Sequence, residues 1–182
     1  MALSSILALH NVNEILNDDN IEIVINVFEG QKVVVEKIEI FGNSVTNEAV
    51  IHVYGADTWG WRGWFAIHTW IAAKRTGELN YTVYDVVGWR KYGGQPVMRI
   101  SHDIPDRHWF GEKPKLIKEH RGKKVDEMID AVEKAADDYP WKKTYKAFPG
   151  PNSNTFTAWI AKHVPELELD LPFSAIGSGF VN

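Results

Sequence analysis

The sequence contains no cysteine among its 182 residues. This absence excludes a thiol nucleophile, a disulfide framework and every thiolate metal site. Covalent chemistry, if the protein performs any, must therefore use another side chain. The same absence leaves the redox compartment open, because a chain without thiols fits an oxidising or a reducing environment equally well.

The sequence also lacks an excess of basic residues and a long apolar run near its start. Its 24 acidic and 20 basic residues give a formal net charge of -4. This charge argues against a nucleic-acid partner, since such binding depends on neutralising phosphates. The opening MALSSILALHNVNEIL has neither a basic leader region nor a long apolar core, so we expect no signal peptide and no membrane span there. A cytoplasmic location is the default expectation, with envelope association as the alternative.

Length and composition suit one main globular core. A chain of 182 residues is too short for two full-sized domains. Its eight tryptophans are a heavy load of large rings, and such rings must pack somewhere. The character of the sequence changes at Val50, so we predict an N-terminal extension over residues 1–49 and a main domain over residues 50–182.

Two patterns indicate the structure of the extension. The first is an apolar spacing close to that of a helix, formed by Ile6, Leu7, Leu9, Ile15 and Leu16. It predicts a short amphipathic helix that ends at the turn-forming NDDN. The second is a pair of β-rich runs, residues 21–30 and 32–43, which predict a hairpin turning at Glu29 to Lys32.

The stretch NIEIVINVFEGQKVVVEKIEIFGNSVTNEAVI resembles the junction between successive POTRA repeats of outer-membrane assembly proteins. The features that carry this resemblance are the EG turn, the strand ending IEIFGN and the helix start T-x-x-x-V-I. They supply part of one repeat, which implies that residues 20–50 form a POTRA-like fragment. An ordinary hairpin is the alternative interpretation.

The main domain reads as an antiparallel meander followed by helices. Strands are predicted after Val50, from Phe65 to Ala73, within LNYTVYDVVGW and within PVMRISH. An amphipathic helix is predicted from Val125 to Tyr139, and a last helix from Asn152 to His163. The fold class is therefore α+β, an antiparallel sheet with helices packed on it. The run KLIKEHRGKK is interpreted as a solvated surface.

The segment GPNSNTF presents Ser153 at the start of the last predicted helix. Asn152 is a natural N-cap there, so the helix begins at Ser153. Unpaired backbone N–H groups and the helix dipole stabilise an anion at this position, which is the electrostatic device of acyl-transfer sites. Ser153 is therefore either a nucleophile or merely part of a helix cap.

His68 and Asp85 are the candidate partners of Ser153. His68 shares one face of its predicted strand with Ala66, Trp70 and Ala72, so a neutral imidazole there could take the serine proton. Asp85 on the next strand could orient the ring, with Tyr84 as its substitute if the strand register is shifted by one residue. A purely structural histidine is the alternative.

Four blocks of the sequence are similar to a bacterial family, the domain of unknown function 3750. They are TWGWRGWFAIHTWIA, YTVYDVVGWR, PDRHWFGEKP and FPGPNSNTFTAWIAKHVPELELDLPFSAIG. The similarity covers residues 50–182. It names a family without naming a reaction.

A more distant similarity is to permuted papain-like enzymes of the NlpC and lecithin:retinol acyltransferase type. In that group a strand histidine comes first, an orienting polar residue follows, and a nucleophile opens a later helix. His68, Asp85 and Asn152-Ser153 stand in this order, although Ser153 replaces the cysteine of the group. The similarity implies a permuted papain-like fold and a serine in the nucleophile position.

Several other residues are candidates for binding. The residues predicted to contact the substrate are Asn152, Asn154, Tyr84, Arg62 and Trp70. A set of tryptophans could line an apolar cleft near His68 or pack in the core, namely Trp59, Trp61, Trp64, Trp70 and Trp89. The loop SHDIPDRHWFG carries imidazole and carboxylate groups that suit zinc or iron, but it lacks a recognised ligand spacing. No metal and no cofactor are therefore predicted.

The sequence thus predicts a metal-independent hydrolase or acyltransferase that acts on an ester- or amide-like bond of a small-molecule or acyl substrate. Ser153 would be the nucleophile, His68 the base and Asp85 the orienting group. The alternative is a non-catalytic module for ligand binding or envelope assembly. The sequence does not indicate the oligomeric state.

Overall fold

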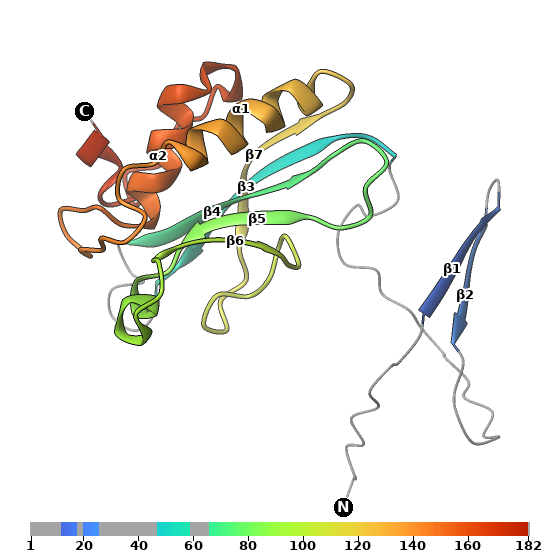
Figure 1. The fold of residues 1–182 in the computed structure, drawn as a ribbon, viewed down its shortest axis with the longest axis horizontal. Helices are drawn as coiled ribbons and strands as arrows, with labels where there is room; N and C mark the ends of the chain where they lie inside the picture. Colours follow the sequence, from blue (N-terminus) through green and yellow to red (C-terminus); the bar gives the residue numbers. More distant parts are fainter. Residues whose placement is uncertain (1–11, 18–19, 26–46, 59–65, 182) are drawn as a thin grey trace, which may run out of the picture. The chain divides into compact units, whose positions relative to one another are not determined.

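The chain divides into two compact units, Met1–Ile40 and Phe41–Asn182. The computed structural model, drawn in Figure 1, describes residues 12–17, 20–25, 47–58 and 66–181. Among the described residues, no helix combines the length and apolarity needed to cross a membrane.

The first unit contains an antiparallel pair of strands, β1 (Val12–Asn17) and β2 (Asn20–Ile25). The predicted amphipathic helix is therefore wrong for residues 12–16, because these residues pair with β2 from Val12↔Ile25 to Leu16↔Ile21. The NDDN tetrapeptide suits a tight turn between two strands as well as it suits a helix end, and this ambiguity caused the error. Most of the predicted hairpin over residues 21–43 lies outside the described residues.

The second unit is built on a five-stranded antiparallel sheet in the order β6-β5-β4-β3-β7. Its strands are β3 (Val50–Asp57), β4 (Ile67–Lys74), β5 (Thr82–Val86), β6 (Met98–His102) and β7 (Lys115–Arg121). The first four form the predicted meander. Strand β7 returns to pair with β3 at the opposite edge, where the sequence predicts only a solvated surface.

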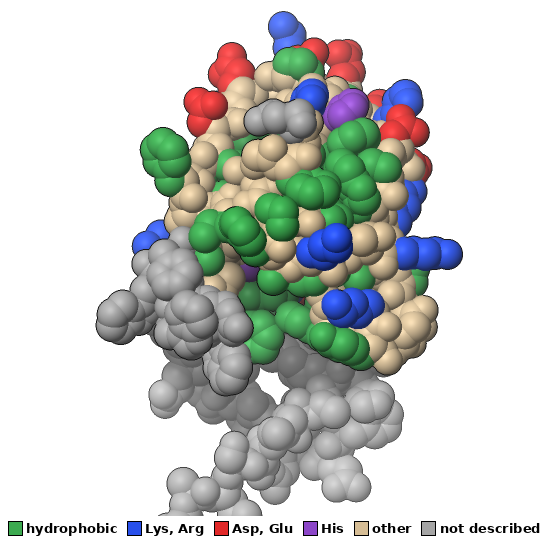
Figure 2. All heavy atoms as spheres, turned by 90° about the vertical axis from the view of Figure 1, so that its left-hand side faces the viewer, with side chains coloured by type: hydrophobic (Ala, Val, Ile, Leu, Met, Phe, Trp, Pro, Cys, Tyr) green, Lys and Arg blue, Asp and Glu red, His purple; other side chains and the backbone are tan. Residues whose placement is uncertain are grey.

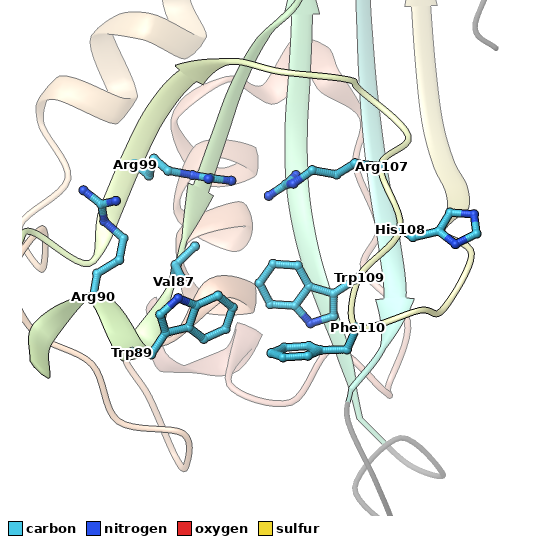
Figure 3. Close-up of a pocket in the computed structure, with 8 residues that line it drawn as sticks. All are labelled: Val87, Trp89, Arg90, Arg99, Arg107, His108, Trp109 and Phe110. Atoms are coloured by element: carbon cyan, nitrogen blue, oxygen red, sulfur yellow. The ribbon is translucent and has the colours of Figure 1, made fainter. Parts of the chain in front are cut away.

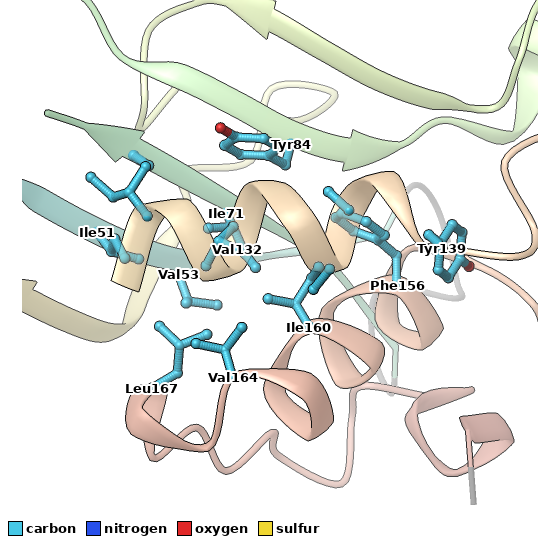
Figure 4. Packing of buried hydrophobic residues seen from close by; sticks show 14 of the residues in the cluster. Ile51, Val53, Ile71, Tyr84, Val132, Tyr139, Phe156, Ile160, Val164 and Leu167 are labelled. Atoms are coloured by element: carbon cyan, nitrogen blue, oxygen red, sulfur yellow. The ribbon is translucent and has the colours of Figure 1, made fainter. Parts of the chain in front are cut away.

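Two helices, α1 (Val125–Asp137) and α2 (Ser153–His163), cover one face of this sheet. Figure 4 shows strand residues such as Ile71 and Tyr84 meeting Val132 of α1 and Phe156 of α2 in the main core. These side chains are almost fully buried. The predicted α+β class, an antiparallel sheet with helices packed on it, is confirmed.

The other face of the sheet carries a second, smaller apolar cluster. It includes Trp70, Val83 and Trp109. The segment after β6 covers this face, because the Trp70 indole donates to the Pro105 carbonyl at 2.8 Å. Short 3₁₀ turns complete the unit at Gly88–Gly93, Pro165–Leu167 and Ser178–Val181. Adjacent positions along β4 thus face two separate cores, and His68 lies on the side of the smaller one.

Candidate functional site

Ser153 is the first residue of α2, as the sequence predicts. The preceding Asn152 has extended backbone angles, and its side-chain oxygen accepts a hydrogen bond from the Thr155 N–H at 3.0 Å. The Asn152 N–H in turn donates to the Thr155 hydroxyl at 3.1 Å. This reciprocal capping box fixes the helix start and leaves the N–H groups of Ser153 and Asn154 without partners inside the helix.

The two asparagines on either side of Ser153 connect the helix start to other segments. The Asn152 amide donates to the carbonyls of Ala147 and Ile176, each at 3.0 Å. The Asn154 amide donates to the carbonyls of Ile67 and Ile176, each at 2.9 Å. Both side chains also border the cavity described next. Asn152 and Asn154, which the sequence predicts as substrate contacts, therefore position Ser153 against β4 and the C-terminal segment.

One glycine makes this arrangement possible. Gly177 has a φ of +96°, and a Cβ atom there would lie 2.3 Å from the Asn152 side-chain nitrogen. Such a distance is far inside van der Waals contact. The backbone of the C-terminal segment can therefore approach the helix cap only because residue 177 has no side chain.

Ser153 and His68 border the same cavity, which has a volume of about 510 Å³. The two residues are far apart in sequence, and the start of α2 is bonded to β4, the strand that carries His68, through the Asn154 amide and the Ile67 carbonyl. The remaining walls are largely aromatic or aliphatic. The full set of lining residues is Thr58, Ala66, Ile67, His68, Trp89, Trp109, Phe110, Tyr145, Ala147, Phe148, Asn152, Ser153, Asn154 and Ile176. A mostly apolar cavity with a few convergent polar groups is typical of a small-molecule site.

His68 is held in this cavity by an aromatic ring. The imidazole is only 5% exposed and stacks on Trp109, with 3.6 Å between ring centroids and 3° between ring planes. Its Nε2 atom is buried and has no hydrogen-bond partner in the described part of the chain. Burial lowers the pKa of His68 to about 3, with further lowering by the positive charges of Arg107 and Arg99. The imidazole is therefore neutral at neutral pH.

Asp85 is fully buried and is bound by two arginines. Arg99 donates from Nε to Oδ1 at 3.1 Å and from Nη2 to Oδ2 at 2.9 Å. Arg107 Nη2 also donates to Oδ2. The hydrogen bonds that this carboxylate makes within the described residues go to these guanidinium groups, and His68 is not among its partners. The strand register explains this, because Ile71 pairs with Tyr84 and Asp85 therefore lies nearest to Trp70.

The remaining predicted site residues lie apart from the cavity or outside the described chain. Tyr84 is 1% exposed on the helix-covered face, where its hydroxyl donates to Glu133 at 3.3 Å. Trp70 is fully buried in the smaller core. Neither borders the cavity of Ser153. Arg62 falls outside the described residues, as do Trp59, Trp61 and Trp64 of the predicted tryptophan cleft.

Three aromatic rings form the most prominent wall of the cavity. Trp89, Trp109 and Phe110 each lie 5.3 Å from the other two, measured between ring centroids. Trp89 and Phe110 are about half exposed, whereas Trp109 is buried against His68. We refer to these three residues as the aromatic wall. The sequence does not predict that Trp109 and Phe110 border the same cavity as Ser153 and His68.

The position of Phe110 depends on an uncommon turn. Trp109 and Glu112 exchange backbone hydrogen bonds of 3.0 Å, and the two residues between them, Phe110 and Gly111, have φ values of 50° and 89°. Positive φ suits glycine but is unfavourable for a bulky residue such as phenylalanine. The strain at Phe110 is thus associated with the presentation of its ring at the cavity.

The surface around the helix start is rich in apolar groups. Figure 2 shows hydrophobic side chains gathered on the side where, in Figure 1, the segment before α2 and the C-terminal residues lie. Phe148 is 78% exposed and Phe180 is 36% exposed. Lysine and arginine side chains are interspersed with them on the same face. This face of the molecule therefore combines apolar area with positive charge.

The fold and the site together define an α+β domain with an aromatic-walled cavity at the start of a helix. The family model for the protein of unknown function (DUF3750) matches residues 48–180. The chain therefore belongs to this family, as the sequence blocks indicate. No curated protein and no solved structure matches the chain.

Proposed function

We propose that this protein is a metal-independent hydrolase or acyltransferase that acts on an ester- or amide-like bond. The observation that carries the proposal is that Ser153 and His68, from distant parts of the sequence, border one cavity at the N-terminus of α2. This arrangement joins a hydroxyl, a neutral imidazole and unpaired backbone donors around one space.

In the proposed reaction, the Ser153 hydroxyl attacks the carbonyl carbon of the bound substrate and His68 takes its proton. The negative charge that develops on the carbonyl oxygen is stabilised by the first N–H groups of α2. His68 then returns the proton to the leaving group, and an acyl-enzyme remains on Ser153. Water or another acceptor releases the acyl group by the same steps in reverse order.

Asp85 acts in this proposal as a positioning residue. It holds Arg107, whose guanidinium carbon lies 5.7 Å from the centre of the Trp109 ring. Trp109 in turn stacks on His68. The orienting role predicted for Asp85 is therefore exerted through two intervening side chains.

The proposal includes a permuted papain-like arrangement of the site. The order of His68, Asp85 and Ser153 in the sequence supports it, and so does the cavity that a serine at a helix start shares with a strand histidine. Serine is a weaker nucleophile than cysteine, so His68 must act as an effective base. The POTRA-like character of residues 20–50 and a location in the envelope stay predictions.

A non-catalytic ligand-binding module is the second candidate. Its support is that the Asp85 carboxylate is bound by arginines and makes no hydrogen bond to His68. Without a directly bonded carboxylate, an imidazolium formed on His68 is less well stabilised. The same cavity would then hold a ligand without turnover.

A fluorophosphonate probe tests the catalytic proposal. We expect the wild-type chain to form an adduct at Ser153, detected by mass spectrometry of the digested protein. Ser153→Ala should form no adduct, and His68→Gln should slow labelling about 100-fold or more, as expected for loss of a general base. Ser101→Ala is the matched control, because Ser101 lies on β6 away from the cavity. A folded wild-type chain that is not labelled would contradict catalysis and favour the binding module.

A further inference from the structure

A second cavity, of about 270 Å³, adjoins the cavity of Ser153 and His68. It is bordered by the side chains of Arg90, Arg99 and Arg107, and no aspartate or glutamate is among its described lining residues. Figure 3 shows the guanidinium groups of Arg99 and Arg107 pointing toward each other near the rings of Trp89 and Trp109. We refer to the space bordered by these three arginines as the arginine pocket.

The guanidinium groups are held in place by contacts below and beside the pocket. Asp85 binds Arg99 and Arg107 from a fully buried position, and Asp103 approaches the same two arginines at 3.7 and 3.2 Å. Arg90 donates from Nε to the Pro96 carbonyl at 2.8 Å. Three arginines against two aspartates leave one positive charge, which resides on Arg90.

The pocket retains donors that the described protein groups do not use. The Nη1 atom of Arg107 is buried and lacks a hydrogen-bond partner within the described residues. A buried donor without a partner is costly, because it has lost its contacts with water. Among the described residues, the hydrogen bond to Pro96 uses only the Nε atom of Arg90. The terminal N–H groups of Arg90 therefore remain for an anionic group from outside the chain, beside the guanidinium groups of Arg99 and Arg107.

The aromatic wall is common to both cavities. Trp89, Trp109 and Phe110 border the arginine pocket and also the cavity of Ser153 and His68. The exposed parts of Trp89 and Phe110 provide a continuous apolar surface between the two spaces. One molecule that lies across this wall can therefore reach the guanidinium groups and Ser153 at the same time.

We propose that the arginine pocket binds an anionic group, a carboxylate or a phosphate, of the same molecule whose apolar part occupies the cavity of Ser153 and His68. Planar guanidinium groups bind either anion through paired hydrogen bonds and also stack on aromatic rings. The identification of this molecule as the substrate rests on the proposed function. Its binding to the two cavities is independent of that function.

This occupancy has a consequence for His68. The positive charges of Arg107 and Arg99 add to the effect of burial in lowering the pKa of His68. An anion bound to those arginines offsets part of their field. The substrate would then raise the basicity of the imidazole at the moment when it has to accept the proton of Ser153. An anionic substrate would thereby activate the site more than a neutral one.

Isothermal titration calorimetry with the full-length Ser153→Ala protein tests the proposal without turnover. The probes are octyl phosphate, octanoate and octanol, which share an apolar chain and differ in charge. We expect at least one anionic probe to bind about tenfold or more tightly than octanol, as a charge-assisted hydrogen bond allows. The tighter of the two anions identifies phosphate or carboxylate as the preferred group.

The variant Arg90→Gln, made in the Ser153→Ala protein, tests the pocket itself. It should weaken binding of the preferred anion about tenfold and leave octanol binding unchanged. Lys91→Gln removes the same charge from an exposed neighbour that does not border the pocket, and it should change neither affinity. Circular dichroism confirms that each variant is folded.

Two results would overturn this inference. The first is octanol binding as tight as that of both anions. The second is an equal loss of anion binding in Arg90→Gln and Lys91→Gln, which indicates a general charge effect. Fluorophosphonate labelling of Ser153 together with either result leaves the proposed reaction in place and removes the anionic substrate. Selective anion binding by a protein that is never labelled leaves the pocket in place and removes the reaction.

Discussion

The buried polar residues of the site differ in how their burial is compensated. Two guanidinium groups replace the water that the Asp85 carboxylate loses on burial. His68 has a ring partner but no charged partner, so it stays neutral. Stability and chemistry are thus linked at His68, since the environment that keeps the imidazole in its neutral form also lowers its basicity.

The pH dependence of stability should report the burial of His68. Its pKa of about 3 in the folded protein lies below the ordinary value of 6.5, so between these two pH values the unfolded chain binds more protons. Stability should therefore fall as the pH drops from 6.5 toward 3, by on the order of 3–5 kcal/mol from this group. We expect His68→Gln to show a shallower decline in urea denaturation at pH 7, 6, 5 and 4.

His102→Gln is the control for this experiment, because His102 is exposed on β6. It should retain the wild-type slope. Burial also lowers the pKa of His52, and that contribution remains in both variants. Equal slopes for His68→Gln and the wild type would contradict the neutral, buried state of His68.

At the scale of elements, the cap of α2 depends on the close approach of the C-terminal segment. Gly177→Ala would place a Cβ atom 2.3 Å from the Asn152 side chain and would force an unfavourable φ on alanine. We expect a loss of about 2–4 kcal/mol in the free energy of unfolding. For a chain of this size the corresponding fall in Tm is roughly 5–15 °C, measurable by calorimetry.

The neighbouring Gly179→Ala provides the comparison for Gly177→Ala. A Cβ atom at residue 179 would have no heavy atom within 4 Å, and its φ is not in the unfavourable range. Its Tm should stay within about 2 °C of the wild type, as for an ordinary surface substitution. Similar losses at both positions would show that the clash with Asn152 is not the cause.

The sequence predicts some elements well and others poorly, for reasons that the structure makes clear. Helix α2 begins and ends where expected, because an asparagine cap and Pro165 are local signals. Strand β7 was missed because it is a largely polar edge strand whose identity depends on pairing with β3. The contacts of Asp85 could not be predicted from the sequence either, because they depend on how the loop after β6 brings Arg107 close to β5.

The site was partly predictable for the same reason. Ser153 is marked by its local helix start, and His68 by its place in a predicted strand. Their common cavity is a tertiary property, and so is the aromatic wall, whose rings come from separate segments. Local patterns indicate which side chains have chemical potential, but only packing determines which of them meet.

At the scale of the whole molecule, both apolar clusters belong to the second unit. The main cluster spans Ala49 to Leu167, and the smaller cluster spans Val50 to Trp109. A unit with its own core can fold by itself. We therefore expect a chain that lacks residues 1–40 to unfold in a single cooperative transition in thermal circular dichroism.

The same truncated chain should keep fluorophosphonate labelling of Ser153 if the full chain is labelled, because every described residue that borders the cavity lies after residue 57. Full-length protein measured in parallel is the reference for both properties. A broad, non-cooperative transition in the truncated chain would show that the second unit needs the first in order to fold.

The turn at Phe110 has a further consequence, for protein engineering. Asparagine or glycine would adopt the positive φ at this position with less strain, so a selection for heat resistance alone would favour replacing Phe110. The resulting protein would lose one ring of the wall that both cavities share. A screen for thermostable variants of this protein therefore needs a test of ligand binding beside the test of heat resistance. Without it, the screen will enrich variants that are more stable and have lost part of the binding surface.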